Sequence, residues 1–162
     1  MTYAWQVSNV RDALANLNAI LELFGQGSIP AWKAVAWLFY NAHFVTVTYP
    51  LPGAGSKASQ NLISSSEGNL TLLYLLPPLL LVLAGLVVAL AADTAEPVDG
   101  LKAGLAVVPG YFVLAVLGVF LTVHSIENAS IGVDAVTGVL LAGLVYPAAF
   151  GGIGGALGSF IR

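Results

Sequence analysis

Three long stretches of the chain, residues 68–92, 103–126 and 135–161, contain no Asp, Glu, Lys or Arg and consist mostly of Leu, Val, Ala, Gly and Phe. Each is longer than the ~20 residues that an α-helix needs to cross a hydrocarbon core. The apolar positions run continuously and do not alternate with polar ones, which favours helices over the strands of a membrane barrel. We therefore predict transmembrane helices over residues 70–92, 101–124 and 135–161.

The first residues show a different pattern, because apolar side chains recur at alternating spacings of three and four residues. This seam consists of Val7, Val10, Leu14, Leu17, Leu21 and Phe24. It predicts an amphipathic helix over residues 3–24. Such a helix lies on the membrane or on its own bundle, or its seam pairs with another chain, and both interpretations remain open.

Residues 31–49 are apolar but rich in aromatic side chains, and they carry Asn41 and His43 near the middle. The segment is just long enough to cross a membrane, which is the favoured interpretation, whereas its aromatic content also suits a re-entrant or surface helix. Residues 50–69 are dominated by Pro, Gly, Ser and Asn, which predicts an external surface loop.

Together these patterns predict an all-α integral membrane bundle, a single domain over residues 1–162, with about four transmembrane helices and an N-terminal amphipathic helix. Four spans would place both termini on one side. Lys and Arg gather on the cytoplasmic side, so we expect both termini in the cytoplasm. The charges brought to that side are Arg11, Lys33, Lys102 and Arg162, with Lys57 alone opposite.

Two N-glycosylation sequons, Asn69-Leu70-Thr71 and Asn128-Ala129-Ser130, fall on the side predicted to be external. Asn69 and Asn128 are therefore candidate acceptor residues, although such short motifs also arise by chance.

The amino-acid composition argues against several classes of protein function. Hydrophobic residues make up 58% of the chain and charged residues only 8%, against about 25% in a typical soluble domain. The absence of cysteine excludes a thiol nucleophile and a cysteine-based metal site, and a net charge of −3 without a basic run argues against nucleic-acid binding. No catalytic triad, phosphate loop or dinucleotide fingerprint is present, so we expect neither an enzyme nor a cofactor.

The last predicted span carries two GxxxG spacings, which let helix backbones approach closely. Its small residues are Ala148, Gly151, Gly152, Gly154, Gly155 and Gly158. They pack either against the other spans of the same chain or against a partner, and the sequence leaves both alternatives open.

The histidines and prolines are the remaining candidates for function. His43 lies beside Asn41, and His124 lies near Glu127 at the end of a predicted span. A His–carboxylate pair could bind a metal or sense pH, but interfacial or hydrogen-bonded histidines are the favoured interpretation. Each predicted long span also contains proline, which bends helices and, in transporters, frees carbonyl groups for substrate. These prolines are Pro77, Pro78, Pro109 and Pro147.

The run Ala31-Trp32-Lys33-Ala34-Val35-Ala36-Trp37-Leu38-Phe39-Tyr40-Asn41-Ala42-His43-Phe44 resembles a signature of an uncharacterised family of haloarchaeal multi-pass membrane proteins. The runs Leu73-Tyr74-Leu75-Leu76-Pro77-Pro78 and Leu141-Ala142-Gly143-Leu144-Val145-Tyr146-Pro147 are similar to the same family. The resemblance implies the plasma membrane of a halophilic archaeon and no known activity. Members of that family carry a further apolar segment before the point where this chain begins, which would favour a re-entrant or surface element at 31–49.

The leading prediction is a non-enzymatic structural or accessory subunit, which contacts the lipid bilayer and packs with copies of itself or with a larger membrane complex. The first alternative is a small transporter or channel with proline-broken helices. The second is a protein that binds lipid or carotenoid in grooves lined by Trp32, Trp37, Phe39 and Phe44.

Overall fold

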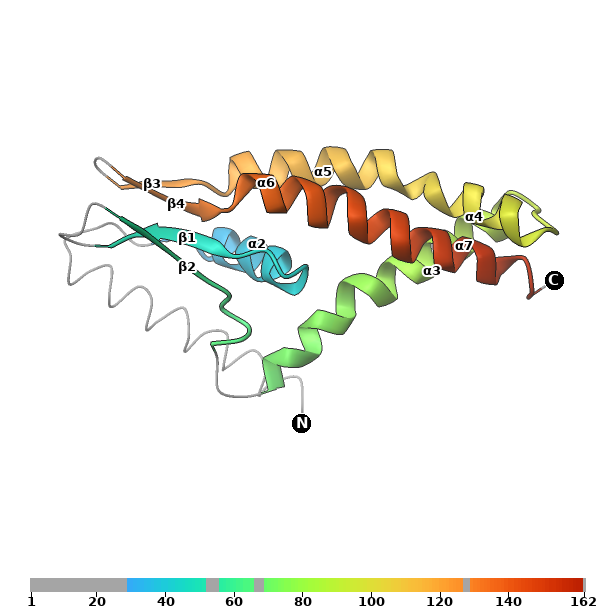
Figure 1. The fold of residues 1–162 in the computed structure, drawn as a ribbon, viewed down its shortest axis with the longest axis horizontal. Helices are drawn as coiled ribbons and strands as arrows, with labels where there is room; N and C mark the ends of the chain where they lie inside the picture. The colour runs from blue at the N-terminus through green and yellow to red at the C-terminus, as the bar shows by residue number, and fades with distance from the viewer. Residues whose placement is uncertain (1–28, 52–55, 66–68, 127–128, 162) are drawn as a thin grey trace.

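The computed structural model describes residues 29–51, 56–65, 69–126 and 129–161, and within them it contains four helical segments and four short strands. The chain has three long apolar helices, which lie side by side at one end of the molecule, with a small sheet at the other end (Figure 1). The predicted amphipathic helix 3–24, with its whole seam from Val7 to Phe24, lies outside the described residues, as do Glu127 and Asn128.

The three predicted long helices are confirmed. The first joins η1 (Asn69–Leu75) to α3 (Leu76–Ala91), and the second joins α4 (Pro97–Leu105) to α5 (Val107–Leu121). The third comprises α6 (Ala135–Thr137), η2 (Gly138–Val145), η3 (Pro147–Gly151) and α7 (Gly152–Gly158). All three are long and apolar enough to cross a membrane, over Leu70–Ala91, Pro97–Leu121 and Ala135–Gly158.

Proline marks a change of helix geometry in each of the three long helices, which we call the long rods. Pro77 follows the passage from the 3-10 helix η1 into α3, and Pro109 lies in the first turn of α5, just after the break at Ala106. Pro147 begins the second of two π-helical segments, η3. Because proline has no N–H to donate, a helix that contains it adopts a different hydrogen-bonding pattern nearby.

Glycine brings the three rods together at the end that carries the connection 92–96, which we call the loop end. A Cβ atom on Gly85 or Gly104 would collide with the carbonyl oxygen of Gly151, and one on Gly100 would collide with that of Gly155. Backbones in such close contact gain dispersion energy that larger side chains would prevent. Toward the other end α3 diverges from its neighbours (Figure 1).

The second end, which we call the sheet end, carries a four-stranded antiparallel sheet in the order β2-β1-β4-β3. Its strands are β1 (Val47–Pro50), β2 (Lys57–Gln60), β3 (His124–Ile126) and β4 (Ala129–Val133). The all-α prediction therefore requires correction, since the predicted loop 50–69 contributes β2, and the connection between the second and third long helices contributes β3 and β4. These strands are too short to show a period of two in the sequence, and β1 gains its partner β4 only from a distant part of the chain.

The structure does not contain the continuous helix that a span over 31–49 requires. The helix α2 (Ala31–Ala42) has 12 residues, or about 18 Å of length, which is too short for a bilayer core. The chain then reverses at His43 and Phe44 and returns as β1. The segment therefore forms a helix–turn–strand hairpin, closer to the re-entrant alternative.

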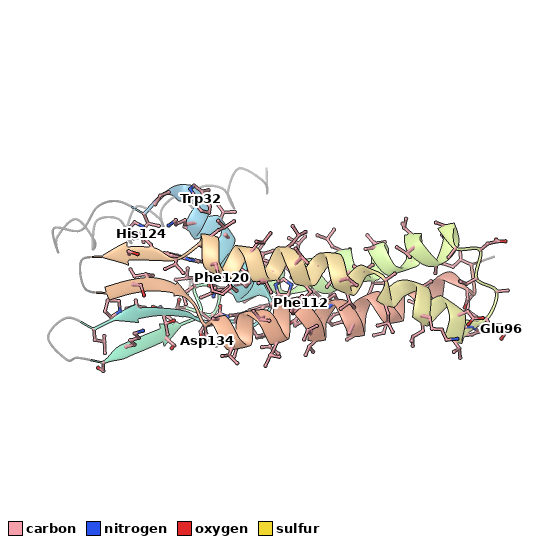
Figure 2. The ribbon with its side chains drawn as sticks, turned by 90° about the horizontal axis from the view of Figure 1, so that it is seen from above. Trp32, Glu96, Phe112, Phe120, His124 and Asp134 are labelled. Atoms are coloured by element: carbon pink, nitrogen blue, oxygen red, sulfur yellow. The ribbon has the colours of Figure 1, made fainter. Side chains whose placement is uncertain are left out.

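This hairpin also removes the basis of the predicted orientation. The Lys33 ammonium donates to the carbonyl oxygen of Val123, so Lys33 lies at the sheet end with Lys57 of β2. Lys102 pairs with Asp99 at 2.8 Å near the loop end. Figure 2 shows the same separation, with Glu96 at one end and His124 and Asp134 toward the other. Lys33 and Lys102 thus lie at opposite ends, so the structure does not bring together the charges on which the predicted orientation was based.

Candidate polar site at the tip of α2

Helix α2 lies along α5 and is held there by one stripe of polar side chains. Each bonds a group on α5 or just beyond its end. The pairs are Lys33 with the Val123 carbonyl, Trp37 with the Thr122 carbonyl at 3.2 Å, Tyr40 with the Ala115 carbonyl, and His43 with the Tyr111 hydroxyl at 2.9 Å. The helices are antiparallel, so His43 lies deepest between the long rods. Tyr111 is ten residues, or about 15 Å, from the last residue of α5.

Apolar packing accompanies these bonds on both sides of α2. Trp37 and Tyr40 belong to a buried core with Val119 of α5, Ala142 of η2 and Val133 of β4. The opposite side of α2 packs through Leu38 and Ala42 against Ile63, Leu70 and Leu73 in a second, smaller core. Helix α2 therefore fills the space that opens where α3 diverges from α5 and η2.

The end of α2 is a Schellman motif with an unusual residue in it. The Val45 amide donates to the Tyr40 carbonyl at 3.1 Å, and the Phe44 amide donates to the Asn41 carbonyl at 3.0 Å. The residue at the left-handed position of this motif is usually glycine, but here it is Phe44, with φ of 61°. A non-glycine residue held there stores roughly 1–3 kcal/mol of strain. The Phe44 ring stacks on Tyr74, with centroids 4.4 Å apart.

The hydrogen bonds of His43 define its tautomer. Its Nδ1 lies 2.8 Å from the Phe39 carbonyl oxygen, which can only accept, so Nδ1 carries the proton. In the neutral ring Nε2 then accepts from the Tyr111 hydroxyl. The side chain is fully buried. Burial lowers the pKa of His43 below its ordinary value, and the Phe39 carbonyl opposes this shift only in part.

Aromatic rings enclose His43 on its remaining sides. Its ring centroid lies 4.6 Å from that of Phe39 and 4.7 Å from that of Tyr146. Tyr146 stands between the π-helical segments η2 and η3, where its amide donates five residues back to Leu141. The π turns rotate the following residues relative to an α-helix, so that Tyr146 meets α2 while Gly151 and Gly155 meet the other two rods.

Asparagine side chains hold the reversal in place. The Asn41 amide is fully buried, donates to the Val45 carbonyl at 2.7 Å and accepts from the Leu62 amide at 2.9 Å. Asn61 in turn donates to the Asn41 carbonyl and accepts from the Tyr74 hydroxyl. Throughout the described residues, every buried side-chain polar atom has a hydrogen-bond partner.

The chain matches a family of unknown function, DUF7978, over residues 1–162. It belongs to the DUF7978 family. This agrees with the predicted resemblance to a family without a known activity. No curated protein and no solved structure matches the chain.

The predicted polar residues separate into two places in this DUF7978 protein. His43 and Asn41 both lie at the tip of α2, whereas His124 begins β3 and pairs with Ile131 of β4 at the sheet end. A pairing of His124 with Glu127 stays a prediction, because Glu127 lies outside the described residues.

The predicted small-residue face of the last span lies within the bundle. Gly151, Gly155 and Gly158 contact α3 or α4, and Gly154 meets the Val82 backbone. Gly152 is buried beside Leu101 and Leu105, whereas Ala148 is half-buried. For the described residues, the structure thus uses this face inside one chain.

The four aromatic residues of the predicted groove differ in exposure. Trp37 is buried in the core, whereas Trp32, Phe39 and Phe44 are exposed. Lipid or carotenoid contact at these three side chains stays a prediction, since an outward aromatic face also suits ordinary lipid contact.

Several residues of this site were missed by sequence reasoning, most notably Tyr111 and Tyr146. One signal could have found them. Tyrosine in membrane helices usually lies near the ends, where its hydroxyl reaches water. Both tyrosines lie well inside apolar runs instead, so each hydroxyl needs a partner within the protein.

Proposed function

We propose that this DUF7978 protein is a non-enzymatic integral membrane protein with three spans and one re-entrant helix, α2. We further propose that it is a structural or accessory subunit, which packs with copies of itself or with a larger membrane complex. The outward faces of the three long helices carry this proposal.

Those faces are apolar and mostly uncovered. Only 22%, 17% and 33% of the residues in the most apolar windows of the three helices are buried inside the chain. Large side chains along all three project outward, among them Leu79, Leu83, Leu114, Leu117, Phe120 and Leu157. An apolar surface of this extent is unfavourable in water but suits lipid or a partner helix.

The interior supports a packing role over a chemical one. The long helices contain no charged residue within 68–92, 103–126 or 135–161. The polar side chains of α2 bond chiefly to backbone carbonyls of α5 or, as with Asn41, to their own turn, and these bonds hold the hairpin. Because Gly151 and Gly155 contact neighbouring rods of the same chain, we assign partner contact to the outward faces and to the seam of residues 3–24.

Purification in a mild detergent, followed by mass determination, tests this function. We expect the chain to need detergent. We expect the protein mass of the particle, with bound detergent subtracted, to exceed the 16.7 kDa of a single copy, either as an oligomer or with a partner membrane protein. Leu14→Asp, on the seam, should reduce the mass of the complex, whereas Asn18→Asp, off the seam, should not. A stable monomer with nothing attached would contradict the subunit proposal.

A second function, a small channel or transporter, is favoured by one observation. Helix α2 ends between the long rods, about 15 Å from the end of α5, and places the polar pair His43 and Tyr111 inside the apolar bundle. Flux measurements on reconstituted vesicles separate the two functions. A channel predicts solute or proton flux that Tyr111→Phe changes, and a packing subunit predicts the background flux of empty vesicles.

A further inference from the structure

The hydrogen bond between His43 and Tyr111 depends on the charge of His43. The proposed subunit role does not use this dependence. In the neutral ring, Nδ1 donates to the Phe39 carbonyl and Nε2 accepts from Tyr111, so both nitrogens are satisfied. A proton added at Nε2 turns that acceptor into a donor aimed at the Tyr111 oxygen. The Tyr111 hydroxyl hydrogen then has to find another acceptor.

Among the described residues, no charged group that would stabilise the resulting cation faces His43. The titratable groups that face His43 within the described residues are Tyr111 from α5 and Tyr146 from between η2 and η3, both neutral at physiological pH. Phe39 supplies an apolar ring from α2 itself. The charge-free stretches that pack here contain no carboxylate, and Lys33 lies ten residues away at the other end of α2.

The helix end does not compensate either. Cations are favourable at a helix C-terminus because its last carbonyl groups are unpaired. Here the carbonyl groups of Tyr40 and Asn41 already accept from the amides of the Schellman turn, and that of Phe39 accepts from His43. A buried imidazolium in this place would therefore be strongly unfavourable, and moving the tip toward water or lipid headgroups would relieve it.

We propose that the His43–Tyr111 hydrogen bond is a pH-sensitive latch for the α2 hairpin. The latch is closed while His43 is neutral and holds the tip of α2 between α5 and η2. Protonation of His43 breaks it, and the segment from Phe39 to Val45 moves away from Tyr111. Phe44 favours this movement, because opening releases its left-handed backbone conformation.

The linkage between proton binding to His43 and opening of the latch gives the direction and size of the pH effect on the opening equilibrium. Burial holds the pKa of His43 below its ordinary 6.5 while the latch is closed, and exposure restores it. The opening equilibrium constant therefore rises as the pH falls below 6.5, by up to tenfold per pH unit, until the closed state is protonated too.

Hydrogen–deuterium exchange on the full chain in detergent micelles tests the latch from about pH 8 to pH 5. The readout is the protection of the amides of His43, Phe44 and Val45. Each variant is compared with wild type at the same pH, which cancels the intrinsic pH dependence of exchange. His43→Gln keeps a donor and an acceptor but does not titrate, and His124→Gln is the matched control at the other histidine.

We expect wild type and His124→Gln to lose protection below pH 6.5 relative to His43→Gln, by up to tenfold per pH unit. Tyr111→Phe should reduce protection at every pH, by about threefold to tenfold, because it lacks the hydroxyl. Identical pH profiles for wild type and His43→Gln would overturn the proposal.

Nitrogen-15 histidine spectra of the unmutated chain give a second test if a variant fails to fold. The chain has only two histidines, so both signals can be followed. We expect His43 to be neutral with its proton on Nδ1 near pH 8, and to titrate over the same range in which protection is lost. Titration of His43 without loss of protection, or loss of protection without titration, would refute the latch.

Discussion

Phe44 occupies a backbone position that normally belongs to glycine, and it does so at the point where the chain reverses between the long helices. Its neighbours explain how the strain is tolerated. Asn41 bonds both the Val45 carbonyl and the Leu62 amide, and Tyr74 stacks on the Phe44 ring. Each of these residues has a role only because the others are present, which is typical of a turn buried away from water.

Removal of the Asn41 side chain should destabilise the protein markedly. Asn41→Ala leaves the Leu62 amide and the Val45 carbonyl without their partner in a buried place, so we expect a loss of about 2–4 kcal/mol. Unfolding of the purified protein by increasing dodecyl sulfate in mixed micelles measures this. Ser65→Ala, an exposed side chain in the adjacent turn, is the control and should change stability by less than about 0.5 kcal/mol. Equal stabilities of the two variants would contradict the role of Asn41.

Asp134 provides a pH-dependent contribution outside the long apolar runs. Its carboxylate accepts from the Thr137 amide and hydroxyl, each at 2.8 Å, and caps the start of the third rod. These hydrogen bonds, the amide first, lower the pKa of Asp134 below its ordinary 3.8. A lowered pKa means that the folded protein binds the proton less tightly. Its stabilisation is therefore complete above pH 3.8 and is lost as the pH falls through the folded-state value.

We therefore expect Asp134→Ala to reduce stability by about 0.5–2 kcal/mol at neutral pH. The difference from wild type should shrink steadily as the pH falls below 3.8. Unfolding curves recorded over a pH series measure both effects. Asp99→Ala, which removes an exposed ion pair with Lys102, serves as the control and should cost no more than about 0.5 kcal/mol. A pH-independent difference would show that the cap does not act through its charge.

The helices meet each other by different means at the two ends of the bundle. At the loop end glycine allows backbones to touch, and at the sheet end α2 fills the gap with aromatic side chains and hydrogen bonds to carbonyls. The small residues were visible in the sequence, but their partner was not. GxxxG spacing says that a close neighbour exists, and it is equally compatible with the same chain and with another one.

Gly155→Ala tests the close contact, with Gly110→Ala as its matched control. A Cβ at Gly155 would collide with the backbone of Gly100 and Gly104, whereas a Cβ at Gly110 has nothing within 4 Å. Overpacking should cost about 1–3 kcal/mol at Gly155, while Gly110→Ala should be neutral or more stable by up to about 1 kcal/mol. Unfolding in mixed micelles reports both values. The contact assignment fails if both substitutions have the same effect.

At the scale of the whole chain, the structure has two ends of different character. The sheet end carries the four strands and the start of the α2 hairpin. The loop end carries Asp93, Glu96 and the Asp99–Lys102 ion pair. If the three long helices cross a membrane, residues 30, 59 and 130 share one side and residue 95 lies on the other. The predicted four-span arrangement would instead separate residue 30 from residue 59.

Single cysteines decide between these arrangements, because the natural chain contains none. We expect Pro30→Cys, Ser59→Cys and Ser130→Cys to react with a membrane-impermeant maleimide from the same side of sealed vesicles. Ala95→Cys should react only from the opposite side. All four positions are exposed. Labelling of Pro30→Cys together with Ala95→Cys would show that 31–49 crosses the membrane and that the hairpin is wrong.

Residues 31–49 are the part of the chain whose structure could least be predicted from the sequence. An apolar, aromatic run of this length looks the same whether it crosses a membrane or doubles back. The reversal depends on Leu62 and Tyr111, which are 21 and 68 residues away from their partners Asn41 and His43. Likewise, β1 pairs with β4 across a large sequence separation. Such contacts leave no local period to detect.

The sequence by itself determined the three long helices, because each apolar run is continuous, uncharged and long enough, and a helix satisfies its own backbone hydrogen bonds within a few residues. It also determined that the glycines would lie at a close backbone contact. Only the tertiary structure decided that α2 stops and turns back, that the sheet forms, and that His43 meets Tyr111. Those outcomes rest on hydrogen bonds and packing between residues far apart in the chain, whose partners are chosen when the helices assemble.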